Sequence, residues 1–320
     1  MKLYLLPILI SFALSFVFCL VLIPILRRLK AGQNILSYVK EHESKNGTPT
    51  MGGLAFIAAA VVAAAIFIDY NASSVTRVPI ICLAVGLAYM IIGLLDDYLK
   101  KCHHENLGLH PWQKLLFQTV VAIFCGIYCY RVGLTRLYIP FFNEVIELSW
   151  WIIPLAIFVF LGTVNAINLT DGLDGLAAGV SVPFFSTFGV LILLQEGTQG
   201  LSVVSLCLVG ALLAYLLFNV PPASVFMGDT GSLSLGGFAA AIAVFSGNAL
   251  YLMVVGLCFV VSVISVIIQV IYYKVTHGKR VFLMAPIHHH FQQKGYSEGR
   301  ISYAYFTVTT LLGLLCLCFM

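Results

Sequence analysis

The chain has 320 residues, of which 61% are hydrophobic and only 9% charged, and its formal net charge is +4. Because soluble domains carry roughly 25% charged residues, this composition excludes a soluble protein and leaves no room for a separate soluble domain. All nine cysteines except Cys102 lie in apolar runs, which excludes a disulfide framework. We therefore predict one polytopic membrane domain over residues 1–320, with membrane lipids around it and no nucleic-acid partner.

Apolar runs long enough to span a bilayer, which takes about 20 residues, recur along the whole chain. The runs are continuous and do not alternate between polar and apolar residues, so they predict helices and not a barrel. The expected fold class is an all-α integral membrane protein of about ten transmembrane helices. The ninth run is long and contains Gly256, so we expect it to bend or tilt. In chain order, the predicted spans are residues 3–26, 51–68, 78–95, 113–130, 150–168, 175–194, 201–218, 232–246, 249–273 and 302–320.

The loops between these spans alternate in charge. The positive-inside rule makes the lysine- and arginine-rich loops cytoplasmic and places both termini outside. Every histidine and the aspartates discussed below fall on the same side, so the active site is predicted on the cytoplasmic face. The external loop at 131–149 shows no distinguishing feature. The loops predicted to be cytoplasmic are residues 27–50, 96–112, 169–174, 219–231 and 274–301.

Lys45 begins a polar segment, Lys-Asn-Gly-Thr-Pro-Thr-Met-Gly-Gly, just before the second span. Its ammonium group could neutralise a phosphate. Anchoring of a cytoplasmic loop by a positive charge is the simpler alternative, and both interpretations remain open.

Two adjacent carboxylates, Asp96 and Asp97, close the third span, with Lys100 one turn later. Such a pair suits Mg²⁺, which takes one or two carboxylates together with phosphate oxygens. The pair could instead accept a proton, because like charge raises the pKa of one carboxyl. Alternatively, the two aspartates have no function and only form a solvated helix end that pairs with Lys100.

The stretch Asn165–Gly175 joins two apolar runs and contains Asp171 and Asp174. Charges are costly next to hydrocarbon and are rarely kept there without a use. Gly172 permits a tight turn and a close approach of the backbone. Helix capping by Asp171 is a simpler explanation, but Asn168 and the second aspartate exceed what a cap needs.

Asp229 lies in a glycine-rich turn, Gly-Asp-Thr-Gly, that opens a helix. Such a backbone can present N–H groups to phosphate, although an N-cap role would also explain the aspartate. Asn219 closes the preceding helix. Phe226 could stack on a base, while packing at the membrane interface is the simpler interpretation.

Three consecutive histidines, His288, His289 and His290, follow Pro286. A zinc site is possible, but no cysteine or second histidine pair has the usual spacing. We prefer hydrogen bonding to phosphate or sugar, with a surface tract of no function as the alternative.

Taken together, one membrane face combines aspartates, lysines, histidines and glycine turns. That combination fits Mg²⁺-dependent handling of a diphosphate substrate against a membrane-embedded partner, since metal ions clamp attacking and leaving oxygens in such transfers. No Walker A motif and no Gly-x-Gly-x-x-Gly is present, so ATP-driven and Rossmann-type functions have no support.

Five segments resemble the prokaryotic polyprenyl-phosphate N-acetylhexosamine-1-phosphate transferases, and the resemblance covers essentially the whole chain. The strings Thr-Pro-Thr-Met-Gly-Gly and Pro-Ile-His-His-His-Phe are typical of the branch that transfers phospho-N-acetylmuramoyl-pentapeptide. The segments are Lys45–Gly53, Asp96–Lys100, Asn165–Gly175, Asn219–Gly231 and Ala285–Gly295.

The resemblance implies a reaction of peptidoglycan synthesis in the bacterial plasma membrane. Phospho-N-acetylmuramoyl-pentapeptide passes from UDP-N-acetylmuramoyl-pentapeptide to undecaprenyl phosphate, which forms lipid I and releases UMP with Mg²⁺ as cofactor. The family is also dimeric, which implies a homodimer, and its ninth helix bends into the bilayer beside a lipid groove.

The resemblance also implies roles for single residues. Asp229 is the expected Mg²⁺ ligand, and Asp96 and Asp97 are expected at the lipid phosphate or in catalysis. The predicted catalytic residues are Asp96, Asp97, Asp229 and His288, and the predicted substrate-binding residues are Lys45, Lys100, Asn168, Asp171, Asp174, Asn219, Phe226, His289 and His290.

Two other functions compete with this prediction. The nearer one is a UDP-N-acetylglucosamine:polyprenyl-phosphate N-acetylglucosamine-1-phosphate transferase, which shares the aspartate motifs. The other is a secondary transporter, although transporters place ionisable residues near mid-bilayer and often show inverted repeats, which we do not see. Direct attack and a two-step path through an aspartyl phosphate both remain open.

Overall fold

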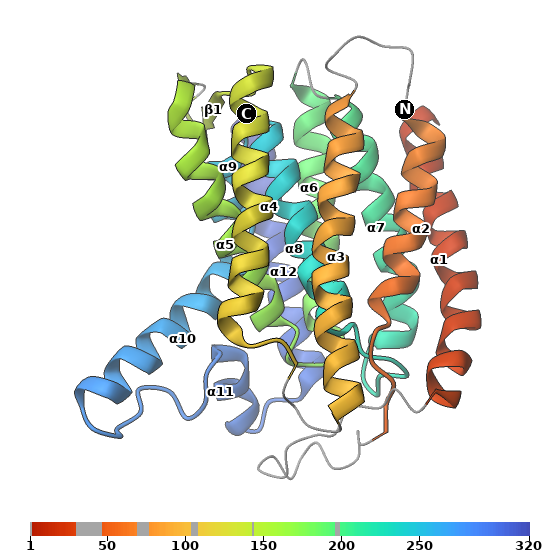
Figure 1. Ribbon diagram of the computed structural model, residues 1–320, viewed down its shortest axis with the longest axis vertical. Coiled ribbons are helices and arrows are strands. Elements are labelled where there is room, and N and C mark those ends of the chain that lie inside the picture. Colours follow the sequence, from red (N-terminus) through yellow and green to blue (C-terminus); the bar gives the residue numbers. More distant parts are fainter. Residues whose placement is uncertain (1, 30–46, 69–76, 104–107, 143, 196–198) are drawn as a thin grey trace.

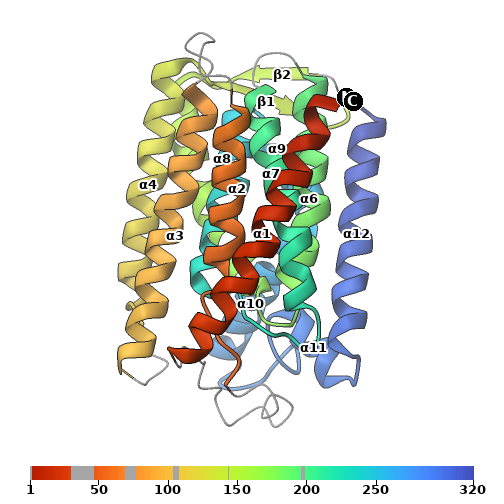
Figure 2. The same cartoon turned by 90° about the vertical axis from the view of Figure 1, so that its right-hand side faces the viewer.

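The computed structural model describes residues 2–29, 47–68, 77–103, 108–142, 144–195 and 199–320. These residues form a bundle of helices that run along one common axis (Figures 1 and 2). Within them, nine helices are long and apolar enough to cross a membrane, and one apolar helix, α2 (Gly53–Phe67), is shorter. The prediction of a helical multi-pass membrane protein is confirmed.

The spanning helices match the predicted apolar runs, and several extend beyond them at the polar ends. The first turn of α1 and the last turn of α12 lie at the same end of the bundle (Figure 1). The long helices are α1 (Lys2–Arg28), α3 (Arg77–His103), α4 (Pro111–Val132), α5 (Ile152–Thr170), α6 (Leu176–Leu194), α7 (Gln199–Asn219), α8 (Gly228–Phe245), α10 (Leu257–Val275) and α12 (Glu298–Cys318).

The ninth predicted span breaks at Gly256, as expected. The short helix α9 (Ala249–Val255) ends just before this glycine, and α10 begins just after it. Figure 1 shows α10 leaving the bundle at an angle. Its outer face is exposed and apolar, with Ile267 and Ile271 among the exposed side chains, so it is suited to contact with lipid.

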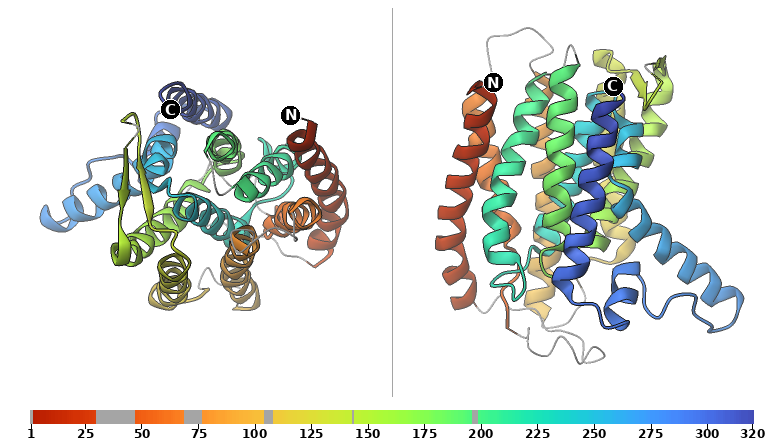
Figure 3. Two further views of the ribbon diagram at one scale, coloured as in Figure 1. Left: turned by 90° about the horizontal axis from the view of Figure 1, so that it is seen from above. Right: turned by 180° about the vertical axis from the view of Figure 1, so that it is seen from behind.

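Helix α8 lies at the centre of the bundle (Figure 3), and almost every residue after its first turn is buried. It packs mainly against α3 and α5. Glycines allow the close approach, because a Cβ on Gly237 would lie 2.4 Å from the ring of Tyr89, and one on Gly93 would lie 2.1 Å from the Asp229 carbonyl oxygen. Small residues at helix contacts are a common device of membrane bundles.

The segment 131–149, which showed no distinguishing feature in the sequence, contains an antiparallel pair of strands, β1 (Arg136–Ile139) and β2 (Glu144–Glu147). The N–H of Tyr138 in β1 donates to the carbonyl oxygen of Gly247, 2.9 Å away, just beyond the end of α8. A short 3-10 helix, η3 (Ser149–Trp151), then leads into α5. The strand pair therefore fixes the end of α8 opposite to Asp229.

A second element that the sequence did not predict is the short helix α11 (Ile287–Gln293), which carries the three histidines. It lies at the end of the bundle where α8 begins, beside the loop between α5 and α6 (Figure 2).

We expect Gly93→Ala to destabilise the protein, because the added methyl group would overlap the Asp229 carbonyl group. Overpacking of this kind costs about 1–3 kcal/mol of unfolding free energy. Gly162→Ala is the matched control, since it lies inside α5, and among the described residues nothing beyond its chain neighbours and the local helix backbone lies within 4 Å of the added carbon. Thermal unfolding in detergent should show a lower midpoint for Gly93→Ala alone. Equal midpoints would mean that α3 can move away from α8 without loss.

Candidate active site

Three aspartates from two helices form an acidic cluster, which consists of Asp96, Asp97 and Asp229. Oxygen atoms of their carboxylates lie within 4.8 Å of one another. Asp96 and Asp97 lie near the end of α3 and are buried, and Asp229 is the second residue of α8. The structure thus joins two motifs that are far apart in the sequence.

Asp97 binds the first turn of α8. One of its oxygens accepts the N–H of Asp229 at 3.1 Å, and the other accepts the N–H and the hydroxyl of Thr230 at 2.9 and 2.7 Å. A carboxylate in this position satisfies N–H groups that have no partner within the helix, and it lies at the positive end of the helix dipole. Asp97 therefore connects α3 to α8 and orients Asp229.

Two lysines bridge the other two carboxylates. The Nζ of Lys100 lies 2.7 Å from Asp96 Oδ2 and 2.9 Å from Asp229 Oδ2. The Nζ of Lys114, from α4, lies 3.2 and 2.6 Å from the same two oxygens. Lys114 was not among the site residues predicted from the sequence, although its place just inside a predicted span was a usable signal, since cations are costly there.

Asn168, near the end of α5, orients the remaining oxygen of Asp229. Its Nδ2 donates to Asp229 Oδ1 at 2.7 Å and to the Ser232 hydroxyl at 2.9 Å. A hollow of about 410 Å³ adjoins the cluster between α4 and α5, and Lys114 and Asn165 are among the residues that line it. The cluster and the side chains that hold it therefore come from four helices, α3, α4, α5 and α8, with open space on one side.

The cluster has the donor set of a divalent cation site. Three carboxylates and two ammonium groups leave a formal charge of −1, and each carboxylate oxygen has two lone pairs, of which several remain for a further ligand. Asp96 Oδ1, for example, accepts one N–H, from Leu109 at 2.8 Å. Hard oxygen ligands of this kind suit a divalent cation that also binds water and phosphate oxygens.

A second group of predicted residues surrounds the turn at 171–175, between α5 and α6. The Asp174 carboxylate accepts the N–H of Ala223 at 3.0 Å, and its own N–H donates to Glu298 Oε2 at 3.0 Å. The N–H of Gly175 donates to Asn219 Oδ1 at 3.2 Å. In the structure, Asp174 and Asn219 therefore hold the turn against the α7–α8 loop and the start of α12.

Asp171, at the start of this turn, is only partly exposed. Burial raises the pKa of its carboxyl well above the usual range, and the negative charges of Asp229, Asp97 and Asp174 raise that pKa further. The turn and the acidic cluster therefore belong to one electrostatic environment.

Two histidines of helix α11 lie against the turn at 171–175. A Cβ on Gly172 would lie 2.6 Å from the Nε2 of His288 and 2.8 Å from the Nε2 of His289, so any other residue at that position would have to displace these imidazole rings. His288 is completely buried, and neither of its ring nitrogens has a hydrogen-bond partner among the residues that the structure describes. Burial lowers the pKa of His288 to about 3, with a smaller contribution from His289, so its imidazole is neutral at pH 7.

The third histidine has a different environment. The Nδ1 of His290 accepts the N–H of Leu283 at 3.1 Å, and its ring packs against Phe282 and Phe291. The structure thus brings His288 and His289 to the turn and places His290 against the preceding loop.

Phe226 is half-buried, and its backbone pairs with the segment before α2. Its N–H donates to the carbonyl oxygen of Pro49 at 2.8 Å, and its own carbonyl oxygen accepts the N–H of Gly52 at 2.9 Å. This pairing brings the chain near the second span next to the α7–α8 loop. Lys45 itself lies outside the described residues.

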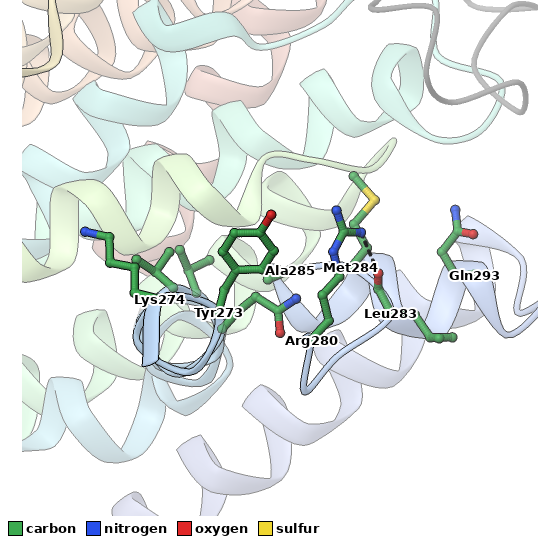
Figure 4. A pocket seen from close by; sticks show the side chains of 10 residues that line it. Tyr273, Lys274, Arg280, Leu283, Met284, Ala285 and Gln293 are labelled. Carbon is green, nitrogen blue, oxygen red and sulfur yellow. Dashed lines mark hydrogen bonds between the residues drawn. The ribbon is translucent and has the colours of Figure 1, made fainter. Parts of the chain in front are cut away.

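A larger hollow of about 600 Å³ lies between α10 and the loop at 280–285, and Figure 4 shows its lining side chains. Tyr273, Lys274 and Arg280 line it, whereas the acidic cluster does not. The side chain of Gln269 fixes the loop, because its Oε1 accepts the N–H of Phe282 at 2.9 Å and its Nε2 donates to the same residue's carbonyl oxygen at 3.1 Å.

We expect His288 to make stability depend on pH. The unfolded histidine has its ordinary pKa of 6.5 and the folded one a pKa of about 3, so the unfolded chain binds more protons between these values. Stability is therefore lost as pH falls from about 6.5 toward 3, by about 2 kcal/mol at pH 5 relative to pH 7.5. Unfolding free energies at both pH values should show this extra loss in the wild type and not in His288→Phe. Equal losses would mean that the folded protein protonates or solvates His288.

Two family models match the sequence of this chain. Residues 78–247 match the model of glycosyl transferase family 4. Residues 45–57 match signature 1 of phospho-N-acetylmuramoyl-pentapeptide-transferase. The first match spans α3 to α8 and therefore contains the whole acidic cluster.

Three proteins named phospho-N-acetylmuramoyl-pentapeptide-transferase illustrate the full-length similarity. The one from Halalkalibacterium halodurans is 40% identical over 316 residues, which cover 98% of this chain and 96% of the relative. The one from Listeria monocytogenes is 41% identical with 96% of each chain covered, and the one from Clostridium botulinum is 44% identical over 95% of this chain and 93% of the relative. The chain therefore belongs to the phospho-N-acetylmuramoyl-pentapeptide-transferase family, within glycosyl transferase family 4.

Proposed function

We propose that this membrane enzyme transfers phospho-N-acetylmuramoyl-pentapeptide from UDP-N-acetylmuramoyl-pentapeptide to undecaprenyl phosphate, which forms lipid I and releases UMP. The observation that carries this proposal is the acidic cluster bridged by Lys100 and Lys114 at one end of a membrane bundle. Such an arrangement can hold a diphosphate together with a cation, next to the layer where a lipid phosphate lies. Family membership supports the choice of both substrates.

Mg²⁺ is the proposed cofactor, with Asp229 as its main ligand and Asp96 and Asp97 within reach. When bound, it would neutralise the diphosphate oxygens and the charge that develops on them. Asn168 holds the orientation of Asp229, and Asp97 holds the helix that carries it.

Lys100 and Lys114 are the proposed phosphate ligands. Both ammonium groups lie on flexible stems and rest on carboxylates, so they can turn toward the phosphate oxygens of a substrate without a change in the backbone. There they would bring the lipid phosphate and the diphosphate together and stabilise the negative charge of the transition state.

Direct attack by the lipid phosphate is the proposed path. A phosphate monoester has its second pKa near 6 and is mostly dianionic at pH 7, so it hardly needs a general base. Attack on the β-phosphorus of the UDP-linked substrate then expels UMP. Asp97 is a poor covalent nucleophile, since both its oxygens already accept hydrogen bonds from the first turn of α8.

The turn at 171–175 and the segments around it form the proposed pocket for the rest of the donor substrate. Phe226 would stack on the base, and Lys45 and Asp171 would contact the nucleotide. Asp174 and Asn219 would shape the pocket through the loops that they hold together.

The histidines of α11 complete the proposed pocket. His288 and His289 would lie beside the sugar and the diphosphate. His290, which already accepts the N–H of Leu283, would support the neighbouring loop and not touch substrate.

We further propose that this end of the bundle faces the cytoplasm, because most lysines and arginines lie in the loops on that side. A homodimer is proposed from the family resemblance alone.

The first test measures UMP. With undecaprenyl phosphate and Mg²⁺, the purified protein should release UMP from UDP-N-acetylmuramoyl-pentapeptide, stop when the metal is chelated, and resume when Mg²⁺ is returned. UDP-N-acetylglucosamine should be a poor substrate, and preference for it would assign the chain to the sister activity. Absence of UMP from folded protein would reject the proposal, and substrate accumulation in vesicles without UMP would favour a transporter.

The second test compares a lysine that is paired with the acidic cluster with one that is not. Lys114→Gln should lower kcat by roughly 100-fold or more, because it removes one of two ammonium groups next to the reacting phosphates. Lys101→Gln is the matched control, since none of the ion pairs among the described residues involves Lys101. Unfolding midpoints should confirm that both variants fold. Similar kcat values for the two variants would contradict the role of Lys114.

A further inference from the structure

Three side chains connect the start of α12 to the histidines of α11. Glu298 Oε2 accepts the N–H of Asp174 at 3.0 Å, and Glu298 Oε1 accepts a hydrogen bond from Gln292 Nε2 at 3.4 Å. Gln292 Oε1 in turn lies 3.0 Å from the Nδ1 of His289. Gln292 is buried, so its amide is held in place by these contacts.

The chemistry of these groups fixes the direction of the hydrogen bonds that run from Glu298 through Gln292 to His289. A carboxylate can only accept hydrogen bonds, so the atom of Gln292 that faces Glu298 must be the amide nitrogen. The amide oxygen then faces His289, and because that oxygen also only accepts, Nδ1 must carry the hydrogen. In the neutral imidazole, Nε2 is then the nitrogen without a hydrogen.

The Nε2 of His289 is also the ring atom that faces the turn at 171–175. A Cβ on Gly172 would lie 2.8 Å from it, so this nitrogen points at the backbone beside Asp171. The tautomer of His289 therefore decides whether the ring presents an acceptor or a donor to the pocket.

We propose that Glu298 and Gln292 are positioning residues that keep the proton of His289 on Nδ1, so that Nε2 serves as a hydrogen-bond acceptor in the donor-substrate pocket. The matching group on the substrate is a hydroxyl or an amide N–H of the amino-sugar portion, and not a phosphate oxygen, which could only accept. This assignment of a ligand group rests on the proposed function, whereas the tautomer itself rests only on the contacts above.

The test reverses the direction of these hydrogen bonds with one substitution and restores it with a second. In Glu298→Gln, the new amide oxygen still accepts the N–H of Asp174, so its nitrogen faces Gln292. Gln292 must then turn its oxygen toward residue 298 and its nitrogen toward Nδ1, which moves the proton of His289 to Nε2. Adding Gln292→Glu supplies a carboxylate that accepts from both sides, so the double variant should return the proton to Nδ1.

Nitrogen NMR of isotope-labelled histidine in membranes reads the tautomer directly, and the His289 signals are those missing from His289→Asn. We expect hydrogen on Nδ1 in the wild type, on Nε2 in Glu298→Gln, and on Nδ1 again in the double variant. With UDP-N-acetylmuramoyl-pentapeptide as substrate, kcat/KM should fall by about 10-fold or more in Glu298→Gln. It should recover to within roughly three-fold of wild type in the double variant.

Ser302→Ala is the control, because the Ser302 hydroxyl donates to the carbonyl oxygen of Asp174 at 3.2 Å and takes no part in the chain to His289. It should leave the tautomer unchanged. If Glu298→Gln fails to fold, Gln292→Leu tests the same point, since it breaks the chain without touching the Asp174 N–H and should give both tautomers.

Hydrogen on Nε2 in the wild type, or an unchanged tautomer in Glu298→Gln, would overturn the proposal. A tautomer that switches without any change in kcat/KM would overturn the acceptor role of His289, while the release of UMP by the wild type would still stand. Loss of UMP release in the wild type would reject the proposed function, and the NMR result would be unaffected.

Discussion

The close approach of three carboxylates at one end of a membrane bundle, two of them buried and the third only partly exposed, is the constraint on which the rest of this structure depends. A buried charge without partners costs several kcal/mol, and removal of one partner from a buried pair is strongly destabilising. Asp97 is satisfied by the first turn of α8, and Asp96 and Asp229 are satisfied by Lys100 and Lys114. The close packing of α3 against α8, which requires glycine at position 93, follows from the need to bring these groups together.

The proposed donor-substrate side of the site is organised differently, by hydrogen bonds between loops. The turn at 171–175 contacts the α7–α8 loop through Asp174 and Asn219, and it contacts α12 through Glu298. The histidines of α11 lie over Gly172, where a side chain would have to displace their imidazole rings. The proposed pocket is thus built from segments whose contacts join residues 44 to 124 positions apart in the chain. A change in α12 can therefore reach a residue in α11 without touching the acidic cluster.

Much of this could be predicted from the sequence, for identifiable reasons. Spanning helices are long apolar runs, so hydropathy alone located them, and Gly256 marked the break between α9 and α10. The two motifs of the acidic cluster each lie near a helix end on the same predicted side of the membrane, which made their convergence foreseeable. The separate roles of Asp96 and Asp97 were not foreseeable, because adjacent helical residues point about 100° apart and only the position of α8 shows which one it meets.

Other features gave weaker signals. Lys114 resembles an ordinary positive-inside anchor until the tertiary structure places it on Asp229. Helix α11 is seven residues long, too short for a recognisable period, and the strands β1 and β2 are four residues each. The proposed tautomer of His289 depends on Gln292 and Glu298, and the hydrogen bonds between these side chains became visible only when the structure placed α11 against the start of α12.

The length of α8 determines how deep in the bilayer Asp229 would lie. Its 18 residues span ~27 Å, close to the roughly 30 Å thickness of the hydrocarbon layer. If the strand pair beside its far end lies at one surface of the hydrocarbon layer, the first turn of α8 would lie near the opposite boundary between acyl chains and headgroups. In the proposed reaction, Asp229 would then meet the lipid phosphate at the level where such phosphates reside, and the polyprenyl tail would stay in the acyl layer while its charged end reacts.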